Sequence, residues 1–211
     1  MSIPALPDGP VAGEAVEYVR SLESEPVANH SVRSYLFAFL LAEHEGLTAG
    51  KDFDTDLLFY ACLLHDLGTS RSAPGKQRFE VEGADLAAEF LTGHGYGPRE
   101  TDSVWEAIAL HCSPGIAERR GVLAYLTRAG VGADFGIGVD FVTDAQGEAI
   151  HRRHPRMNMV AVLVDEIVRH AAGSAAASAR FTLAGELVRE RGAHGTPTSL
   201  ELAASSSRWG G

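Results

Sequence analysis

The sequence predicts an all-α protein built as a single helical bundle. Apolar residues recur at helical spacing in most segments between Gly and Pro residues, whereas no alternating apolar and polar pattern of any length indicates a strand. The chain has no internal repeat, and its 211 residues are enough for one domain. Because 45% of the residues are hydrophobic, this domain can bury a sizeable core.

Composition divides the chain into three parts. Residues 1–10 contain three prolines and are expected to form a loose lead-in. Residues 11–191 carry the helical patterns and form the predicted domain, with loops expected at 70–79 and in the Gly-rich segment 130–141. Residues 192–211 show little helical periodicity, so we expect a mobile tail there.

Gly, Pro and capping residues mark the ends of the predicted helices. Pro26 and Gly46 bound one helix, and Asp54 or Thr55 can cap the next, which Gly68 ends. The expected helices are Val11 to Leu22, Glu25 to Gly46, Thr55 to Asp66, Val81 to Leu91, Arg99 to His111, Gly121 to Ala129, Met157 to Arg169 and Phe181 to Arg191.

The uninterrupted apolar run at residues 57–64 ends at two adjacent polar residues, His65 and Asp66. A helix that is apolar all round is buried, so both side chains need partners inside the protein. A metal ion is the most economical partner, because imidazole and carboxylate groups are common ligands and a cation offsets the buried charge. His30, on the preceding apolar helix, is the expected third ligand, and Asp134 is a candidate fourth.

Simpler interpretations of these residues stay open. His65 and Asp66 can be a polar pair that is satisfied at a helix end. Asp134 competes with Asp140 and Asp144, because an aspartate beside a glycine is common in turns.

The order His30, His65-Asp66, Asp134 resembles the H…HD…D pattern of the HD-domain metalloprotein superfamily. The likeness covers roughly residues 29–140 and is closer to the cyanamide-hydratase-like branch. The motifs that carry this closer likeness are HSVR at 30–33, CLLHDLG at 62–68, FE at 79–80 ahead of Gly83-Ala84, and EAIALH at 106–111. The stretch LHCSPGIAERRG differs from that branch, which leaves the substrate open.

The resemblance implies an enzyme with one divalent metal ion. Phe79 stands where dinuclear members place a histidine for a second metal, which favours a single ion. Zinc is the first choice, while iron, manganese and nickel also suit two imidazoles and two carboxylates. Asp66 is expected to act in catalysis as well as in metal binding, and His111 or Glu80 is expected to shuttle a proton.

Three further residues, Phe79, Thr69 and Arg33, are expected to contact the substrate. Structural reasons alone also place a histidine at a helix end and a glutamate in a first turn, as at His111 and Glu80. We expect His94 in a loop, and the run HRRHPR at 151–156 on a solvated face, with phosphate binding as a weaker alternative.

The acidic net charge of −10 argues against nucleic acid as a partner. Two cysteines without a CxxC pattern favour a reducing cytoplasm, and no signal segment or membrane span is expected. The partner is therefore a small-molecule substrate, and the chain can form a homo-oligomer. Three hypotheses stay open for the function: a hydratase of nitrile-like compounds such as cyanamide, a phosphohydrolase of nucleotides or small phosphate esters, and a non-enzymatic metal- or ligand-binding helical protein.

Overall fold

The computed structural model describes residues 3–195 and 197–210. Within these residues the chain is all-α, as predicted: one isolated β-bridge joins Ala49 and Phe53, and there is no strand. The elements are α1 Pro10–Leu22, α2 Glu25–His44, α3 Thr55–Leu64, the 3-10 helix η1 Leu67–Thr69, α4 Phe79–Gly93, α5 Pro98–Leu110, the 3-10 helix η2 Ala117–Arg119, α6 Val122–Asp134, α7 Asp144–Arg153, α8 Met159–Ala171, α9 Leu183–His194 and α10 Ser199–Ser205.

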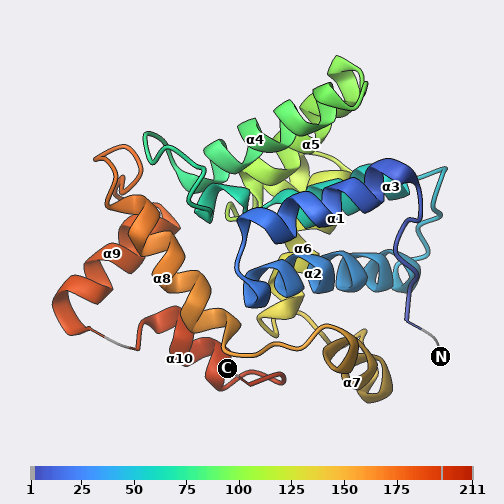
Figure 1. Ribbon diagram of the computed structural model, residues 1–211. Coiled ribbons are helices and arrows are strands. Elements are labelled where there is room, and N and C mark those ends of the chain that lie inside the picture. Colours follow the sequence, from blue (N-terminus) through green and yellow to red (C-terminus); the bar gives the residue numbers. More distant parts are fainter. Residues whose placement is uncertain (1–2, 196, 211) are drawn as a thin grey trace.

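Helices α1 to α6 form the body of the molecule, and α8 to α10 gather on one side of it (Figure 1). Helix α3 lies at the centre of the body and contacts α1, α2, α4, α5 and α6. Its N-terminus is capped by Asp54, whose side chain accepts from the backbone N–H groups of Asp56 and Leu57. This cap was one of the two alternatives predicted, and it starts the apolar run that is buried on all sides.

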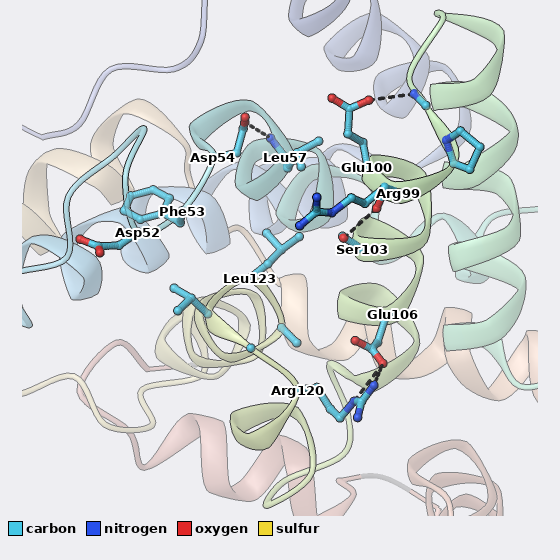
Figure 2. Close-up of a pocket in the computed structure, with 15 residues that line it drawn as sticks. Asp52, Phe53, Asp54, Leu57, Arg99, Glu100, Ser103, Glu106, Arg120 and Leu123 are labelled. Carbon is cyan, nitrogen blue, oxygen red and sulfur yellow. Dashed lines mark hydrogen bonds and ion pairs between the residues drawn. The ribbon is translucent and has the colours of Figure 1, made fainter.

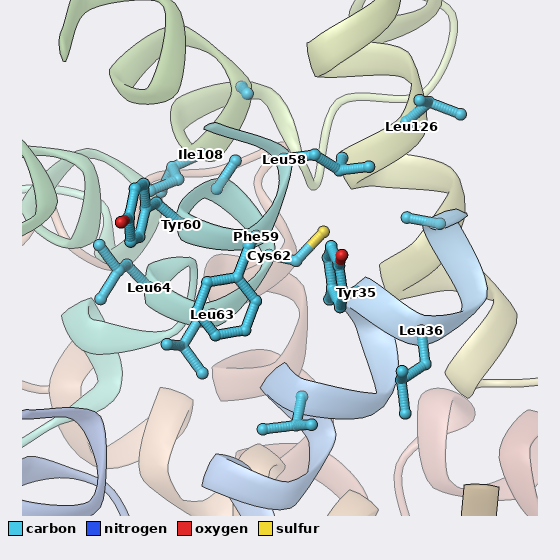
Figure 3. Packing of buried hydrophobic residues seen from close by; sticks show 14 of the residues in the cluster. Tyr35, Leu36, Leu58, Phe59, Tyr60, Cys62, Leu63, Leu64, Ile108 and Leu126 are labelled. Atoms are coloured by element: carbon cyan, nitrogen blue, oxygen red, sulfur yellow. The ribbon is translucent and has the colours of Figure 1, made fainter. Parts of the chain in front are cut away.

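The apolar core has two separate parts. The larger cluster fills the body and joins α3 to its neighbours, with Tyr35, Phe59, Leu63, Ile108 and Leu126 among its members (Figure 3). The smaller cluster lies under α8 and includes residues from α2, α4, α9 and α10. Its fully or nearly fully buried members are Val27, Phe79, Met159, Val160, Leu163, Val164, Ile167, Ala171, Ala184, Leu187 and Ala204.

Helix α6 runs to Asp134, although the sequence predicted its end at Ala129 and a loop after it. Gly130, one of the glycines that suggested a loop, serves close packing instead. A Cβ atom on Gly130 would lie 2.3 Å from the backbone oxygen of Ser34, so α2 and α6 approach backbone to backbone there. The side chain of Asp134 is thereby placed on a helix that packs tightly against α2.

Two segments carry helices that the sequence analysis did not predict. Helix α7 begins with a capping box between Thr143 and Gln146, and its last turn holds residues 151–153 of the run that was expected on a solvated face. That expectation was wrong for His154 and Arg156, which are 8% exposed and 9% exposed in the side chain. Helix α10 lies within residues 192–211, where we expected a mobile tail, and it begins with a capping box between Thr198 and Glu201. Among the described residues, no helix combines the length and apolar character needed to cross a membrane.

Candidate metal centre

Three predicted ligands come together where α2 and the end of α3 meet. His30 lies in α2, His65 caps the C-terminus of α3, and Asp66 begins the turn into η1. All three are almost completely buried, and one ligand atom from each lies within 4.8 Å of the others. His65 Nε2 lies 3.1 Å from Asp66 Oδ2, and His30 Nε2 lies 3.7 Å from the same oxygen.

The turn at η1 exists because two glycines allow a very close approach. A Cβ atom on Gly68 would lie 1.8 Å from the backbone oxygen of Phe79, and one on Gly83 would lie 3.1 Å from the backbone oxygen of His65. Helix α4 therefore packs directly against the His-Asp turn. This contact brings Phe79 and the neighbouring residue Glu80 to the metal-binding side chains.

The three atoms that converge are also unsatisfied. His30 Nε2, His65 Nε2 and Asp66 Oδ2 are buried and have no hydrogen-bond partner within the described part of the chain. Buried polar atoms without partners are costly, and those in a native protein call for an explanation. Two imidazole nitrogens and one carboxylate oxygen form a donor set that suits a divalent first-row metal. The residues present therefore fit a metal ion.

Electrostatics keep Asp66 charged and His30 neutral, which are the forms that bind a metal. Burial alone would raise the pKa of Asp66, but the rings of His65, His30 and His111 outweigh it and hold that pKa below its ordinary value. Burial lowers the pKa of His30, which favours its neutral form. Burial also opposes the charged form of His65, but the Asp66 carboxylate outweighs it and raises that pKa. A cation at this point would compete with protons for His65 Nε2 and the Asp66 carboxylate, because metal ligands bind in their deprotonated forms.

Hydrogen bonds on the far side of each ring fix the histidines. His65 Nδ1 donates to the backbone oxygen of Cys62 at 2.7 Å, and His30 Nδ1 donates to Asp134 Oδ2 at 2.7 Å. Because both partners are acceptors, the protons lie on Nδ1 and the Nε2 lone pairs face the centre. Bonds of this kind orient metal-binding histidines.

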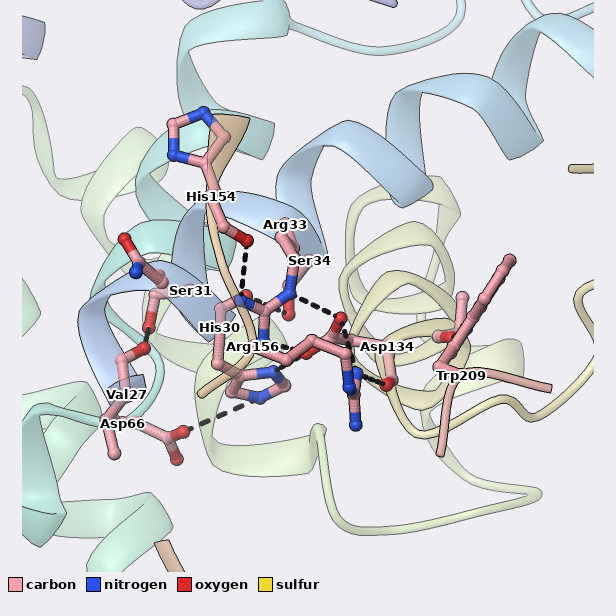
Figure 4. Close-up of polar contacts among 12 residues, drawn as sticks. Val27, His30, Ser31, Arg33, Ser34, Asp66, Asp134, His154, Arg156 and Trp209 are labelled. Atoms are coloured by element: carbon pink, nitrogen blue, oxygen red, sulfur yellow. Dashed lines mark hydrogen bonds and ion pairs between the residues drawn. The ribbon is translucent and has the colours of Figure 1, made fainter. Parts of the chain in front are cut away.

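Asp134, the predicted fourth ligand, lies outside the group of three converging atoms and is held by other residues. Arg33 donates from Nε to Oδ1 and from Nη2 to Oδ2, each at 2.7 Å, and Arg156 donates to Oδ1 at 3.2 Å (Figure 4). With the His30 contact, both carboxylate oxygens are already engaged. Burial would raise the pKa of Asp134, but Arg33 holds it well below its ordinary value. The alternatives Asp140 and Asp144 are exposed.

Arg33, which we expected to contact the substrate, is surrounded by protein acceptors in the structure. Its side chain is fully buried, and its Nη1 donates to the backbone oxygens of His154 and Pro155, each at 3.1 Å. With Nε and Nη2 on Asp134, every nitrogen of the guanidinium has a protein acceptor. Arg33 is thus a structural partner of Asp134.

Two other predicted site residues, His111 and Phe79, lie beside His65 on the side of the metal centre that faces α4 and α5. The ring of His111 lies 4.8 Å from that of His65, and the ring of Phe79 lies 5.7 Å from that of His111. His111 Nδ1 donates to the backbone oxygen of Ile108 at 2.6 Å, which leaves Nε2 as an acceptor. Burial lowers the pKa of His111 to about 4.

Glu80 and Thr69 are also buried at this position. Glu80 Oε1 accepts from Arg78 Nη2 at 2.6 Å, while Glu80 Oε2 has no partner within the described residues. The hydroxyl of Thr69 donates to the backbone oxygen of Asp66 at 2.9 Å, so it helps to hold the His-Asp turn. His94 lies elsewhere: it contacts Glu14 and the end of α4.

Two glutamates near Asp66 were missed by the sequence analysis. Glu23, at the end of α1, is 8% exposed; its Oε2 accepts from Ser31 Oγ at 3.4 Å, and its Oε1 has no partner among the described residues. Glu166, on α8, accepts from Thr69 Oγ1 at 3.4 Å. Burial, together with the charge of Asp66, raises the pKa of both glutamates. Neither stands in a motif, so no sequence signal pointed to them.

A cavity of about 830 Å³ lies apart from the metal centre, between the start of α3 and helices α5 and α6 (Figure 2). Most of its polar groups serve local structure: Asp54 caps α3, Glu100 accepts from the backbone of Gly97, and Arg120 pairs with Glu106. None of the proposed metal ligands lines it. The cavity is therefore not the candidate reaction site.

Comparison with known proteins agrees with the motifs. A model of the HD domain family matches residues 27–171, and the chain belongs to this family. Cyanamide hydratase DDI2 and cyanamide hydratase DDI3 of the yeast Saccharomyces cerevisiae are each 30% identical to the chain over 108 residues. That match covers 50% of this chain and 47% of each relative. The chain thus spans about half the length of the curated relatives it matches.

Proposed function

We propose that this HD-domain chain is a metal-dependent enzyme that adds water to a small nitrile-like compound, with cyanamide as the first candidate. The observation that carries the proposal is the set of three unsatisfied, buried ligand atoms on His30, His65 and Asp66. The two yeast cyanamide hydratases point to the same reaction. A reducing cytoplasm is the proposed setting, since both cysteines are free.

His30, His65 and Asp66 would hold one divalent ion, and Asp134 would orient His30 without binding the ion. Zinc is the first choice, because two nitrogens and one carboxylate are a common protein ligand set of catalytic zinc; iron also suits such a set. When bound, such an ion lowers the pKa of water and polarises the substrate.

His111 is the first candidate for moving the proton. Hydration of a nitrile forms a carbon–oxygen bond, and one proton passes from water to the nitrile nitrogen, which turns cyanamide into isourea. A second proton then moves from the new hydroxyl group to nitrogen, which gives urea. With a pKa of about 4, the His111 ring is neutral at pH 7, so Nε2 can accept a proton from water and return it to the nitrogen. Glu80 Oε2, which is buried and without a partner among the described residues, is the second candidate.

The charges around the centre favour a neutral substrate over a phosphate ester. Each nearby guanidinium group donates to a protein carboxylate: Arg33 and Arg156 to Asp134, and Arg78 to Glu80. Only Arg33 has all of its nitrogens engaged, since Nε of Arg78 and of Arg156 is buried without a partner among the described residues. A phosphate dianion would need such groups free. Instead it would meet the carboxyl groups of Glu23, Glu80 and Glu166. Phe79 and Phe135, whose ring lies 5.3 Å from that of His30, supply apolar walls.

The test is to load the purified chain with zinc and measure urea formed from cyanamide, beside phosphate released from nucleotides and simple phosphate esters. We expect urea and no phosphate. Phosphate without urea would make the chain a phosphohydrolase, and neither product would favour the non-enzymatic binding protein.

Two variants assign the roles. Asp66→Asn should abolish both zinc binding and urea formation. His111→Gln should keep zinc and lose most of the turnover, because its ring lies beside the ligands without being one of them. His94→Gln is the matched control, since His94 lies with Glu14 at the surface and should leave both properties unchanged.

A further inference from the structure

The segment Ser207–Gly210 is far from the metal centre in sequence, but it packs against the last turn of α6, which carries Asp134. Trp209 Nε1 donates to the backbone oxygen of Ala133 at 2.6 Å. The Trp209 ring stacks on Phe37 with the ring centres 5.7 Å apart, and it meets the edge of His151 at 5.0 Å. Trp209 therefore covers the last turn of α6, directly beside Asp134 (Figure 4).

The surface under this segment fits it closely. A Cβ atom on Gly147 would lie 2.8 Å from the Trp209 ring, so α7 leaves room for the indole only because it has glycine there. Arg208 donates to the backbone oxygens of Val139 and Val142, at 3.1 and 2.7 Å, and its guanidinium lies 4.6 Å from the centre of the Trp209 ring. The segment is held by several specific contacts that involve both its backbone and its side chains.

One arginine connects the segment to the metal ligands. Arg156 Nη2 donates to the backbone oxygen of Gly210 at 3.2 Å, and its Nη1 donates to the backbone oxygen of Asp134 at 2.6 Å. The same Nη1 donates to Asp134 Oδ1, and Asp134 Oδ2 accepts from His30. A continuous chain of contacts thus runs from Gly210 and Trp209 to the imidazole of His30.

We propose that the segment Ser207–Gly210, through Trp209 above all, is a positioning element that fixes the metal ligand His30 by way of Asp134. The proposal rests on the metal site proposed above. Trp209 excludes water from the ion pairs of Asp134, and such pairs are strong only where water is excluded. Without the indole, Asp134 gains freedom, and the direction of His30 Nε2 is less well fixed.

The coupling is reciprocal. If the segment raises the affinity of the centre for a metal, then the bound metal must stabilise the docked segment by the same factor. Zinc should therefore slow hydrogen exchange of the Trp209 indole N–H, which is bonded to Ala133 in the docked state. Zinc also stabilises the folded chain as a whole, so a purely structural role would slow exchange of the Trp209 and Trp105 indoles alike. The coupling predicts a greater slowing at Trp209 than at Trp105, whose indole donates to Asp85.

The test compares zinc dissociation constants, measured by competition with a chelator, in the wild type and in Trp209→Phe and Trp209→Ala. Partners outside the ligand set typically change metal affinity by 10–100-fold, so we expect weakening by roughly tenfold for Trp209→Ala. Trp209→Phe, which keeps an aromatic ring but lacks the N–H donor, should fall between Trp209→Ala and the wild type. It also keeps the test valid if Trp209→Ala does not fold.

The control is the same substitution at the other tryptophan. Trp105 donates to Asp85 on the far side of the body, so Trp105→Phe should leave the zinc constant unchanged. Zinc constants within twofold of the wild type in both Trp209 variants, or an indole exchange rate that ignores zinc, would overturn the proposal. A wild type that binds no divalent ion would instead refute the metal site itself.

Discussion

Replacing Asp134 by asparagine tests whether Asp134 binds the metal itself or only orients the ligand His30. Asparagine keeps the size of the side chain and one oxygen that can accept from His30 Nδ1. It removes the charge that pairs with Arg33 at 2.7 Å and with Arg156 at 3.2 Å. If Asp134 only orients His30, the variant still has all three ligand atoms on His30, His65 and Asp66.

The expected effects differ for stability and for metal binding. Breaking a buried ion pair by removing one partner costs about 3–5 kcal/mol, and Asp134 and Arg33 are both fully buried. The free energy of unfolding of the metal-free chain should fall by that amount. Loss of a partner outside the ligand set weakens metal binding about 10–100-fold, which is about 1.4–2.8 kcal/mol.

The assay is zinc titration against a chelator for Asp134→Asn and Asp66→Asn, with urea unfolding of each metal-free variant. We expect Asp134→Asn to bind one zinc more weakly and Asp66→Asn to bind none in the accessible range. Asp140→Asn, at an exposed position, should match the wild type. Loss of zinc in Asp134→Asn as complete as in Asp66→Asn would show that Asp134 is a ligand and that our reasoning is wrong.

Three further predictions test the frame around the centre. Gly130→Ala should lower the free energy of unfolding by about 1–3 kcal/mol in a urea titration, because the new Cβ would lie 2.3 Å from the Ser34 oxygen; an unchanged midpoint would argue against this helix contact. Burial, with Arg33 and two other arginines, lowers the pKa of His154 to about 4. The free energy of unfolding is therefore fully retained above about pH 6.5 and falls by at most about 3 kcal/mol as the pH drops toward 4, because the unfolded chain binds the proton first. His154→Gln should flatten this part of the plot of unfolding free energy against pH. His65→Ala should lose metal and the added thermal stability of the metal-loaded chain, whereas His94→Ala should keep both; equal loss in the two variants would refute the ligand set.

The centre of the fold was predictable because it depends on local patterns. The apolar run at 57–64, with a capping residue before it and a glycine after it, predicts a buried helix, and a His-Asp pair at its end must then face other buried groups. His30 on the preceding apolar helix was the natural third ligand, and the family motifs added Glu80 and His111, which lie close to that pair in the structure.

The contacts of Asp134 were not predictable, since its partners lie far apart in the sequence. Arg33 and Arg156 come from α2 and the α7–α8 connection, and only the packing of α2 against α6 brings them to one carboxylate. Gly130 suggested a loop, because the sequence alone does not distinguish a glycine that ends a helix from one that lets two helices pack closely. Trp209 looked like part of a mobile tail, because its partners Phe37 and His151 lie in distant helices.

The most direct test of the account is the metal content of the wild-type chain, purified without chelators or added metal and measured by elemental mass spectrometry. Three converging ligand atoms, with Phe79 at the position of a second-metal histidine, predict about one divalent ion per chain. A content near two would mean that further residues bind metal. A content near zero would leave the buried atoms of His30, His65 and Asp66 without the partner on which the proposed chemistry depends.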